Sequence, residues 1–133
     1  MAKNQKIVDV VAAIIEKDGE FLIAKRKKGK HLEEKWEFPG GKIEVHETPE
    51  KCLERELKEE FGILVKARNF VAESIFDYGN VKIRLLGYKA KYISGEFNLN
   101  DHDEIKWVVA DELVKFDLAE ADIPLAKKVS NLI

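Results

Sequence analysis

The stretch that decides the fold is residues 41–63, which read GKIEVHETPEKCLERELKEEFGI. Thr48 followed by Pro49 is typical of a helix N-cap and the first helical position, and Gly62 is typical of the residue just past a helix C-terminus. The stretch therefore predicts one helix from Pro49 to Phe61, between two loops. The second half of this helix is unusually rich in glutamate.

Glutamates of this helix gather on one side of it. At about 100° per residue, Glu56, Glu59 and Glu60 fall within an arc about 100° wide, next to an apolar stripe that predicts the core-facing side. Their repulsion at i,i+3 and i,i+4, together with the negative end of the helix dipole, costs about 1 to 2 kcal/mol if nothing compensates it. A charge run is usually a solvated surface, but this cost favours a bound positive charge.

The chemistry of these side chains indicates which cation would bind. Carboxylates with no histidine or cysteine at ligand spacing favour a hard divalent cation, Mg²⁺ or Mn²⁺. Gly40 and Gly41 leave a bare backbone that can offer a carbonyl oxygen as a further ligand. Because Mg²⁺ keeps positions open for water and phosphate oxygens, we expect a diphosphate-containing substrate. Arg55 is placed to hold Glu47 or Glu59 rather than to touch substrate.

Composition and charge exclude several classes of protein. With 133 residues, 45% of them apolar and 36% charged, the chain fits one globular domain spanning residues 1–133. Its net charge of -2 and mixed signs give no basic patch, so no nucleic-acid polymer is expected as a partner. The longest apolar run, residues 10–15, is too short to span a membrane, and the lone Cys52 can form no internal disulfide. The first residues begin no signal peptide, so we expect a cytoplasmic protein with no membrane partner, either a monomer or a homodimer.

The rest of the chain predicts a mixed sheet covered by helices. Asp18-Gly19 lies between two runs rich in β-branched residues and predicts a hairpin turn. Strands are predicted at 7–15, 21–26, 70–76, 81–93 and 107–109, a charged loop at 27–35, a helical turn at 111–113 and a closing helix at 124–132. The histidines, His31, His46 and His102, are expected in solvent-facing loops.

The glutamate-rich stretch resembles the signature box of the Nudix hydrolases. That signature reads Gly, five residues, Glu, seven residues, then Arg-Glu-apolar-any-Glu-Glu-any-Gly-apolar. The sequence meets every position, at Gly41, Glu47, Arg55, Glu56, Leu57, Glu59, Glu60, Gly62 and Ile63. The preceding Trp36-Glu37-Phe38-Pro39-Gly40-Gly41 and the order of the elements resemble the MutT-like branch along nearly the whole chain.

The resemblance implies the fold class and the chemistry. It implies an α/β protein with the Nudix fold, an α/β/α sandwich on a mixed sheet, in which the box forms a catalytic loop-helix-loop. It also implies hydrolysis of a nucleoside diphosphate linked to another group, with Mg²⁺ as the cofactor and Mn²⁺ able to substitute.

The resemblance further assigns roles to residues of the box. The metal would be held by Glu56, Glu59 and Glu60 with help from the backbone of Gly40 or Gly41. The catalytic set would also include Glu47 and Arg55 in supporting roles. An acid from a later loop, residues 100–104, would complete the site or act as a base, and Glu104 is the favoured candidate.

Substrate-binding residues are implied in the same way: Arg26, Glu37, Phe38, Lys42 and Asp122. Arg26 resembles a phosphate-contacting position, although an exposed arginine at a strand end is an equally simple interpretation. Phe38 could stack on a base, yet aromatic residues beside a Pro-Gly-Gly turn are as often packing. Asp122 resembles a residue that reads the nucleobase, and it could equally cap the closing helix. As an ionised group it would only accept hydrogen bonds, which favours the donor-bearing edges of cytosine, guanine or oxidised guanine.

The leading hypothesis for function is hydrolysis of a nucleoside triphosphate to a monophosphate and pyrophosphate, with 8-oxo-dGTP as the expected substrate. A CTP or modified-dCTP pyrophosphatase is the alternative within the same class. A non-catalytic Nudix domain that senses a nucleotide is the alternative from another class. The intact box favours the enzyme, because sensors usually carry an eroded one.

Overall fold

A computed structural model describes residues 6–131 of the chain. It begins with a hairpin of β1 (Ile7–Lys17) and β2 (Glu20–Arg26). The turn between them has positive φ at both central residues, 52° at Asp18 and 81° at Gly19. These angles suit the turn type that matches the twist of a two-residue hairpin, so the turn predicted from Asp-Gly is confirmed.

A mixed sheet is built around β1. This strand runs parallel to β6 (Lys82–Ser94) and antiparallel to β2 and β4 (Gly40–Lys42). On one side β5 (Leu64–Asp77) extends the sheet beyond β6, and on the other β2 pairs with both β3 (Trp36–Glu37) and β7 (His102–Val109). The predicted mixed sheet is confirmed.

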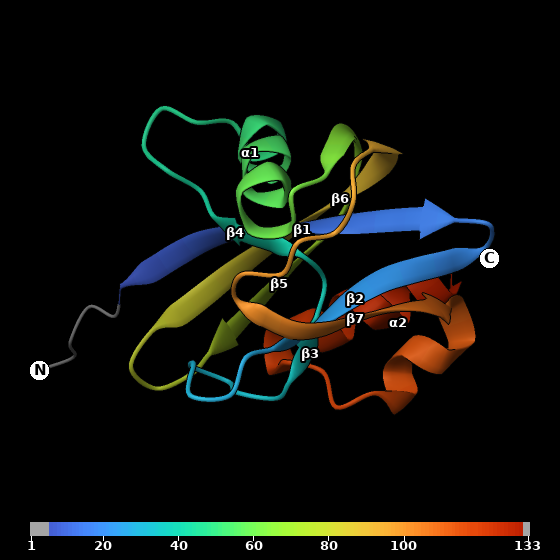
Figure 1. Ribbon diagram of the computed structural model, residues 1–133. Helices are drawn as coiled ribbons and strands as arrows, with labels where there is room; N and C mark the ends of the chain where they lie inside the picture. The colour runs from blue at the N-terminus through green and yellow to red at the C-terminus, as the bar shows by residue number, and fades with distance from the viewer. Residues whose placement is uncertain (1–5, 132–133) are drawn as a thin grey trace, which may run out of the picture.

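Helices cover both faces of this sheet. Figure 1 shows α1 (Pro49–Phe61) on one side of the strands and α2 (Ile123–Asn131) on the other, preceded by the 3₁₀ helices η1 (Ala110–Lys115) and η2 (Glu120–Asp122). Alternate residues of β2 point to the two layers: Leu22 packs with the core under α1, and Ile23 packs with the core under α2. The arrangement is the predicted α/β/α sandwich.

Helix α1 has the bounds that the sequence predicts. Thr48 caps its first turn by accepting a hydrogen bond from the backbone N–H of Lys51 at 3.2 Å. Gly62 follows its C-terminus with a φ of 70°, and its N–H donates to the carbonyl oxygen of Lys58. Because both ends are fixed and the apolar side is buried, the acidic side of α1 has a defined direction.

Some predicted element bounds are wrong. Strand β7 begins at His102 rather than Trp107. The sequence does not predict this start, because the exposed Asp103 and Glu104 follow the buried His102 and leave no apolar run. Strand β5 begins at Leu64 rather than residue 70. Leu132, at the end of the predicted closing helix, lies outside the described residues. No helix within residues 6–131 has the length and apolar character needed to cross a membrane.

Candidate active site

The acids of α1 face a cavity between the helix, β4 and the start of β7. Its volume is about 200 Å³. The cavity is lined by Arg26, Lys30, Glu37, Gly40, Gly41, Glu56, Glu60, Asp101 and His102. Apart from one histidine, its titratable side chains are carboxylates and cations, which is the composition of a site for charged ligands.

The two glycines of β4 allow the backbone to approach its neighbours closely. A Cβ on Gly41 would lie 2.3 Å from the carboxyl carbon of Glu56. A Cβ on Gly40 would lie 1.8 Å from the carbonyl oxygen of Val11 in the central strand. Any side chain at either position would therefore displace the wall of the cavity or the sheet behind it.

Arg55 holds several box carboxylates together. Its Nε and Nη2 donate to the two oxygens of Glu47 at 2.6 and 2.9 Å. Its Nη1 donates to Glu56 at 3.1 Å and to Glu59 at 3.1 Å. The bond with Arg55 lowers the pKa of Glu47 to about 2. Glu59 is 52% exposed and does not line the cavity, so the structure brings Glu56 and Glu60 into the cavity and leaves Glu59 at its rim.

Glu60 meets an acid from outside the helix. Its carboxyl group is hydrogen-bonded to Asp101, and this bond together with burial raises the pKa of Glu60 to about 7. The same bond lowers the pKa of Asp101, whose carboxylate also pairs with Lys30 Nζ at 3.2 Å. Oε2 of Glu60 is buried and has no hydrogen-bond partner among the described residues. A bound cation would give this oxygen a partner, and it would displace the proton that the raised pKa retains near neutral pH.

The donor set fits a hard divalent cation. Carboxylate oxygens of Glu56, Glu60 and Asp101 and the bare backbone of Gly40 and Gly41 line one cavity, and all are oxygen ligands. Within residues 6–131, no three acidic, histidine or cysteine side chains already converge as a ligand set. The contact of Arg55 with Glu56 explains part of this, because that carboxylate is turned toward the guanidinium.

The structure corrects the position of the additional acid. Glu104 lies in β7 opposite Lys25, whereas His102 lies opposite Arg26, because the register shifts between these pairs. Paired residues of neighbouring strands point to the same face of a sheet. Glu104 therefore points to the face covered by α2, away from Glu60, and it is absent from the cavity lining. Asp101 is the acid of this segment that reaches the site.

The prediction that His102 lies in a solvent-facing loop is also wrong. Only 7% of the residue is exposed, and its ring stacks on Phe61 of α1. Its Nε2 lies 2.8 Å from Glu37 Oε2, which also accepts from Arg26 Nη1 at 3.1 Å. No motif in the sequence marks this contact, since it depends on the shift of register in β7.

The other candidate substrate-binding residues lie in different places. The side chain of Phe38 is packed in the core under α2, so it is not free to stack on a base. Lys42 lies outside the cavity that contains Glu60 and lines an open depression with Arg55 and Glu56. The remaining three, Arg26, Glu37 and Asp122, line a second cavity of about 80 Å³, which Phe38 also borders and which reaches Gly40 and Gly41.

Asp122 is buried at the far end of this cleft. Its Oδ2 accepts a hydrogen bond from the backbone N–H of Phe38 at 2.9 Å, so this oxygen does not cap α2. Burial, with a further contribution from the charge of Glu37, raises the pKa of Asp122 well above its usual range. Such a shift favours the neutral acid, which can donate as well as accept, over the ionised acceptor that the sequence suggests.

The cleft continues past Asp122 into an apolar cavity of about 210 Å³. Its walls include Tyr78 and Leu85, and it shares Arg26 and Glu37 with the cavity of the acids. The ring of Tyr78 is fixed from two sides, since its hydroxyl accepts from the N–H of Ala121 and its ring packs against Phe76. A charged end and an apolar end are thus joined through Arg26 and Glu37.

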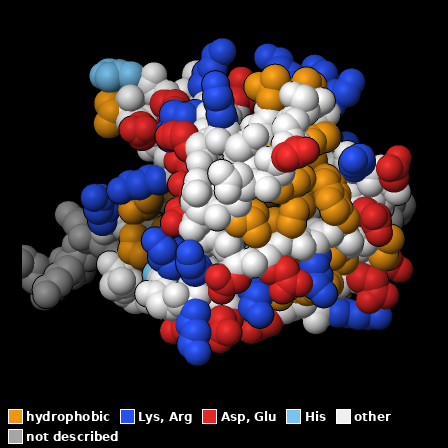
Figure 2. Space-filling view, in the orientation of Figure 1, with side chains coloured by type: hydrophobic (Ala, Val, Ile, Leu, Met, Phe, Trp, Pro, Cys, Tyr) orange, Lys and Arg blue, Asp and Glu red, His pale blue; other side chains and the backbone are white. Residues whose placement is uncertain are grey.

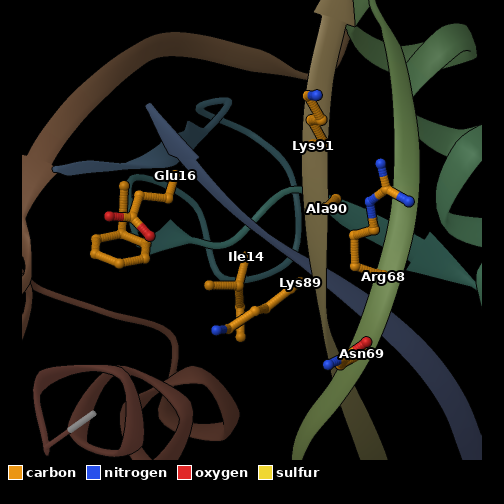
Figure 3. Close-up of a pocket in the computed structure, with 8 residues that line it drawn as sticks. Ile14, Glu16, Arg68, Asn69, Lys89, Ala90 and Lys91 are labelled. Carbon is orange, nitrogen blue, oxygen red and sulfur yellow. The ribbon is translucent and has the colours of Figure 1, made fainter. Parts of the chain in front are cut away.

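A groove elsewhere on the described part of the chain does not show this convergence. A groove of about 360 Å³ lies near the end of β1, between Glu16, Arg68 and Lys91. Figure 3 shows Lys89 and Arg68 on opposite sides of the β6 ribbon, so its polar groups do not point to one place. Figure 2 shows basic and acidic side chains interspersed over the face of the molecule in view.

Comparisons with known proteins agree with this geometry. The NUDIX domain matches residues 5–129. A CTP pyrophosphohydrolase of Escherichia coli K12 is 37% identical over 120 residues, covering 90% of this chain and 89% of that protein. An 8-oxo-dGTP diphosphatase of Haemophilus influenzae is 31% identical over 129 residues, covering 96% of this chain and 95% of that protein. The solution structure of the E. coli ORF135 protein has a TM-score of 0.85 and 34% identity, covering 96% of this chain and 91% of that one.

The chain belongs to the NUDIX domain family, as the match over residues 5–129 and these relatives show. The prediction of a Nudix hydrolase from the box at Gly41 to Ile63 is confirmed. Hydrolases of this family use a divalent metal ion, which agrees with the oxygen-rich cavity beside α1.

Proposed function

We propose that this protein hydrolyses a nucleoside triphosphate to a nucleoside monophosphate and pyrophosphate, with Mg²⁺ as its metal and Mn²⁺ able to substitute. The observation that carries the proposal is a continuous cleft made of three cavities: the cavity of about 200 Å³ that contains Glu60, the cavity of about 80 Å³ that contains Asp122, and the apolar cavity of about 210 Å³. Arg26 and Glu37 border all three. A triphosphate needs cations and a metal at one end, and its base needs an apolar slot with polar groups at the other.

At the acidic end, Glu56, Glu60 and Asp101 would hold the metal, with Glu59 joining them from the rim and the backbone of Gly40 or Gly41 assisting. When bound, Mg²⁺ would neutralise phosphate oxygens and favour an ionised water nucleophile. Arg55 and Glu47 would keep the box carboxylates oriented, since Arg55 donates to several of them. The charges of Arg26 and Lys30 at the same cavity would bind phosphate oxygens.

At the apolar end, Asp122 would bind the base. As a neutral acid it offers one donor and one acceptor side by side, which suits a base edge with an adjacent acceptor and donor. The Watson–Crick edges of guanine and of cytosine both present such a pair, and so does that of thymine. The neutral acid would therefore hold and orient the base, and the other walls of the cavity would select among bases.

Two substrates fit this reading. We propose 8-oxo-dGTP first, because several relatives named 8-oxo-dGTP diphosphatase cover nearly the whole chain. CTP or a modified dCTP is the second candidate, favoured by the 37% identity with a CTP pyrophosphohydrolase. The alternative of a non-catalytic sensor is disfavoured, because every position of the box is intact.

A substrate panel tests the proposal. Purified protein with Mg²⁺ would be offered 8-oxo-dGTP, dGTP, CTP, 5-methyl-dCTP and dTTP, and the release of pyrophosphate and of phosphate would be measured separately. We expect pyrophosphate and a monophosphate from 8-oxo-dGTP or from a cytosine nucleotide. Diphosphate and free phosphate as the main products, or no turnover with any of the five, would contradict the proposal.

The metal assignment has its own control. Glu60→Gln keeps the size of the side chain and removes its charge, so turnover should fall by orders of magnitude while the fold survives.

The extent of the domain, the oligomeric state and the cytoplasmic location stay predictions from the sequence.

A further inference from the structure

Strands β2 and β7 bring Arg26 and His102 side by side. The two residues are paired because Asp103 forms a bulge between this pair and the next, Lys25 with Glu104. Without the extra residue, Arg26 would lie opposite Asp103, and the His102 ring would point to the other face of the sheet. The bulge therefore turns His102 toward the site.

The ring of His102 makes one packing contact and one polar contact. It stacks on Phe61 with the ring centroids 4.9 Å apart. Its Nε2 lies 2.8 Å from Glu37 Oε2. Because a carboxylate only accepts hydrogen bonds, Nε2 must carry the proton of this bond. Nδ1 is buried with no partner in the part of the chain that the structure describes, so His102 acts on its surroundings through Nε2.

Glu37 joins His102 to Arg26. The oxygen that accepts from His102 also accepts from Arg26 Nη1 at 3.1 Å. A second anchor holds the same guanidinium, since Arg26 Nε donates to the backbone carbonyl of His31 at 2.6 Å. Among residues 6–131 no acceptor is bonded to Arg26 Nη2, and Arg26 borders all three cavities of the cleft. The guanidinium is thus fixed on one side and available on the other.

We propose that His102 is a positioning residue for Arg26. It holds the Glu37 carboxylate, and Glu37 holds the guanidinium in the orientation that receives a substrate phosphate. This inference rests on the proposed function, because it requires a phosphate in the cleft. A polyanion entering the cleft would repel Glu37, and the bond from His102 opposes that movement. A guanidinium that is already ordered loses less conformational entropy when substrate binds. Loss of the His102 bond should therefore change KM rather than kcat.

Two substitutions separate the polar role from packing. His102→Phe keeps an aromatic ring against Phe61 and removes the N–H, whereas His102→Gln removes the ring and keeps an N–H near the position of Nε2. With Mg²⁺ and either 8-oxo-dGTP or CTP as the probe, His102→Phe should raise KM about tenfold, and kcat should change by less than about threefold. The KM of His102→Gln should stay within about threefold of wild type. The reverse order, with the Phe variant close to wild type and the Gln variant impaired, would overturn the proposal.

A double substitution tests whether the effect passes through Arg26. Arg26→Met should raise KM on its own, and adding His102→Phe to it should raise KM no further, because the group being positioned is already gone. Independent effects that multiply in the double variant would show that His102 acts by another route.

A measurement on the wild-type protein does not depend on any variant folding. In ¹⁵N NMR spectra at pH 8, Nε2 of His102 should carry the proton. A proton on Nδ1 instead would leave Nε2 without the bond to Glu37 and would also overturn the proposal. If the wild-type protein shows no turnover, the proposed function is refuted. If the wild type is active and His102→Phe has normal turnover with an unchanged KM, only the role of His102 is refuted.

Discussion

The carboxyl groups of Glu60 and Asp101 are hydrogen-bonded to each other across the cavity between α1 and the start of β7. One group comes from the box helix and the other from a segment 41 residues further along the chain. Their hydrogen bond, together with burial, raises the pKa of Glu60 to about 7, and the same bond lowers the pKa of Asp101, so below pH 7 a proton is retained at this pair. A divalent cation would have to displace this proton, which connects metal binding to pH.

We therefore predict that metal affinity weakens as the pH falls through about 7, the pKa of Glu60. One proton competing with the cation should cost about tenfold in affinity per pH unit below that value. Titration of the protein with Mn²⁺, followed by electron paramagnetic resonance at pH 6 and pH 8, measures the effect. Glu60→Gln should bind weakly at both pH values with no such difference. Equal wild-type affinities at pH 6 and 8 would refute the shared proton as the cause.

The metal-free protein should show the opposite trend in stability. Because the pKa of Glu60 is raised from 4.5 to about 7, the folded state binds more protons than the unfolded state between these values. The contribution of this group to the free energy of unfolding is therefore greatest at low pH and falls as pH rises through that window. The lowered pKa of Asp101 acts only below 3.8, outside the window. Between pH 5 and pH 8, Tm of the metal-free wild type should fall by about 2 to 4 °C more than Tm of Glu60→Gln.

Asp101 and Glu104 give a matched comparison. Each is an acid of the segment from which the sequence predicts an additional carboxylate, but only Asp101 lines the cavity with Glu60. Asp101→Asn should lower Mg²⁺ affinity and turnover by about tenfold or more, as expected when a ligand or its support is neutralised. Glu104→Gln should leave both nearly unchanged. Isothermal titration with Mg²⁺ and initial rates measure the two effects. A larger loss in Glu104→Gln would show that Glu104, the acid favoured from the sequence, completes the site.

The misassignment of Glu104 shows where the sequence stops being informative. The helix bounds and the direction of its acidic side follow from local rules: the Thr48 cap, the Gly62 stop and the spacing of Leu53, Leu57 and Phe61. These features are encoded within a few residues of one another. The predictions that depend on them agree with the structure.

The remaining part of the site depends on contacts between distant strands. A one-residue bulge at Asp103 turns His102 toward the cavity, whereas Asp101 reaches it from the segment before β7 and Glu104, paired with Lys25, points to the other face. A bulge reverses the alternation of side chains beyond it, and no turn residue or periodicity in this segment marks its position. The raised pKa of Asp122 is equally hidden, because it results from burial that the tertiary structure creates.

The glycines of β4 should respond differently to the same substitution. In Gly41→Ala the new Cβ meets the end of the Glu56 side chain, which can move. We therefore expect a free energy of unfolding within about 1 kcal/mol of wild type, and a metal affinity reduced about tenfold or more. In Gly40→Ala the Cβ meets the backbone of Val11, which cannot move without disturbing the central strand. That variant should lose about 3 kcal/mol of stability. Urea unfolding and Mn²⁺ titration of both variants test the contrast, and a stable Gly40→Ala protein would refute the packing argument.

The last prediction concerns Asp122, whose Oδ2 accepts from the N–H of Phe38 in the apolar part of the cleft. Asp122→Asn keeps an acceptor for this N–H and keeps a donor beside it, so stability and base preference should change little if the acid is neutral in the wild type. Asp122→Ala leaves the buried N–H without its partner and should cost about 1 to 3 kcal/mol of stability. It should also raise KM for 8-oxo-dGTP or CTP about tenfold or more, because the base loses a hydrogen-bonding partner. If Asp122→Ala melts lower but keeps the KM of the wild type, Asp122 only supports Phe38, and another wall of the cleft holds the base.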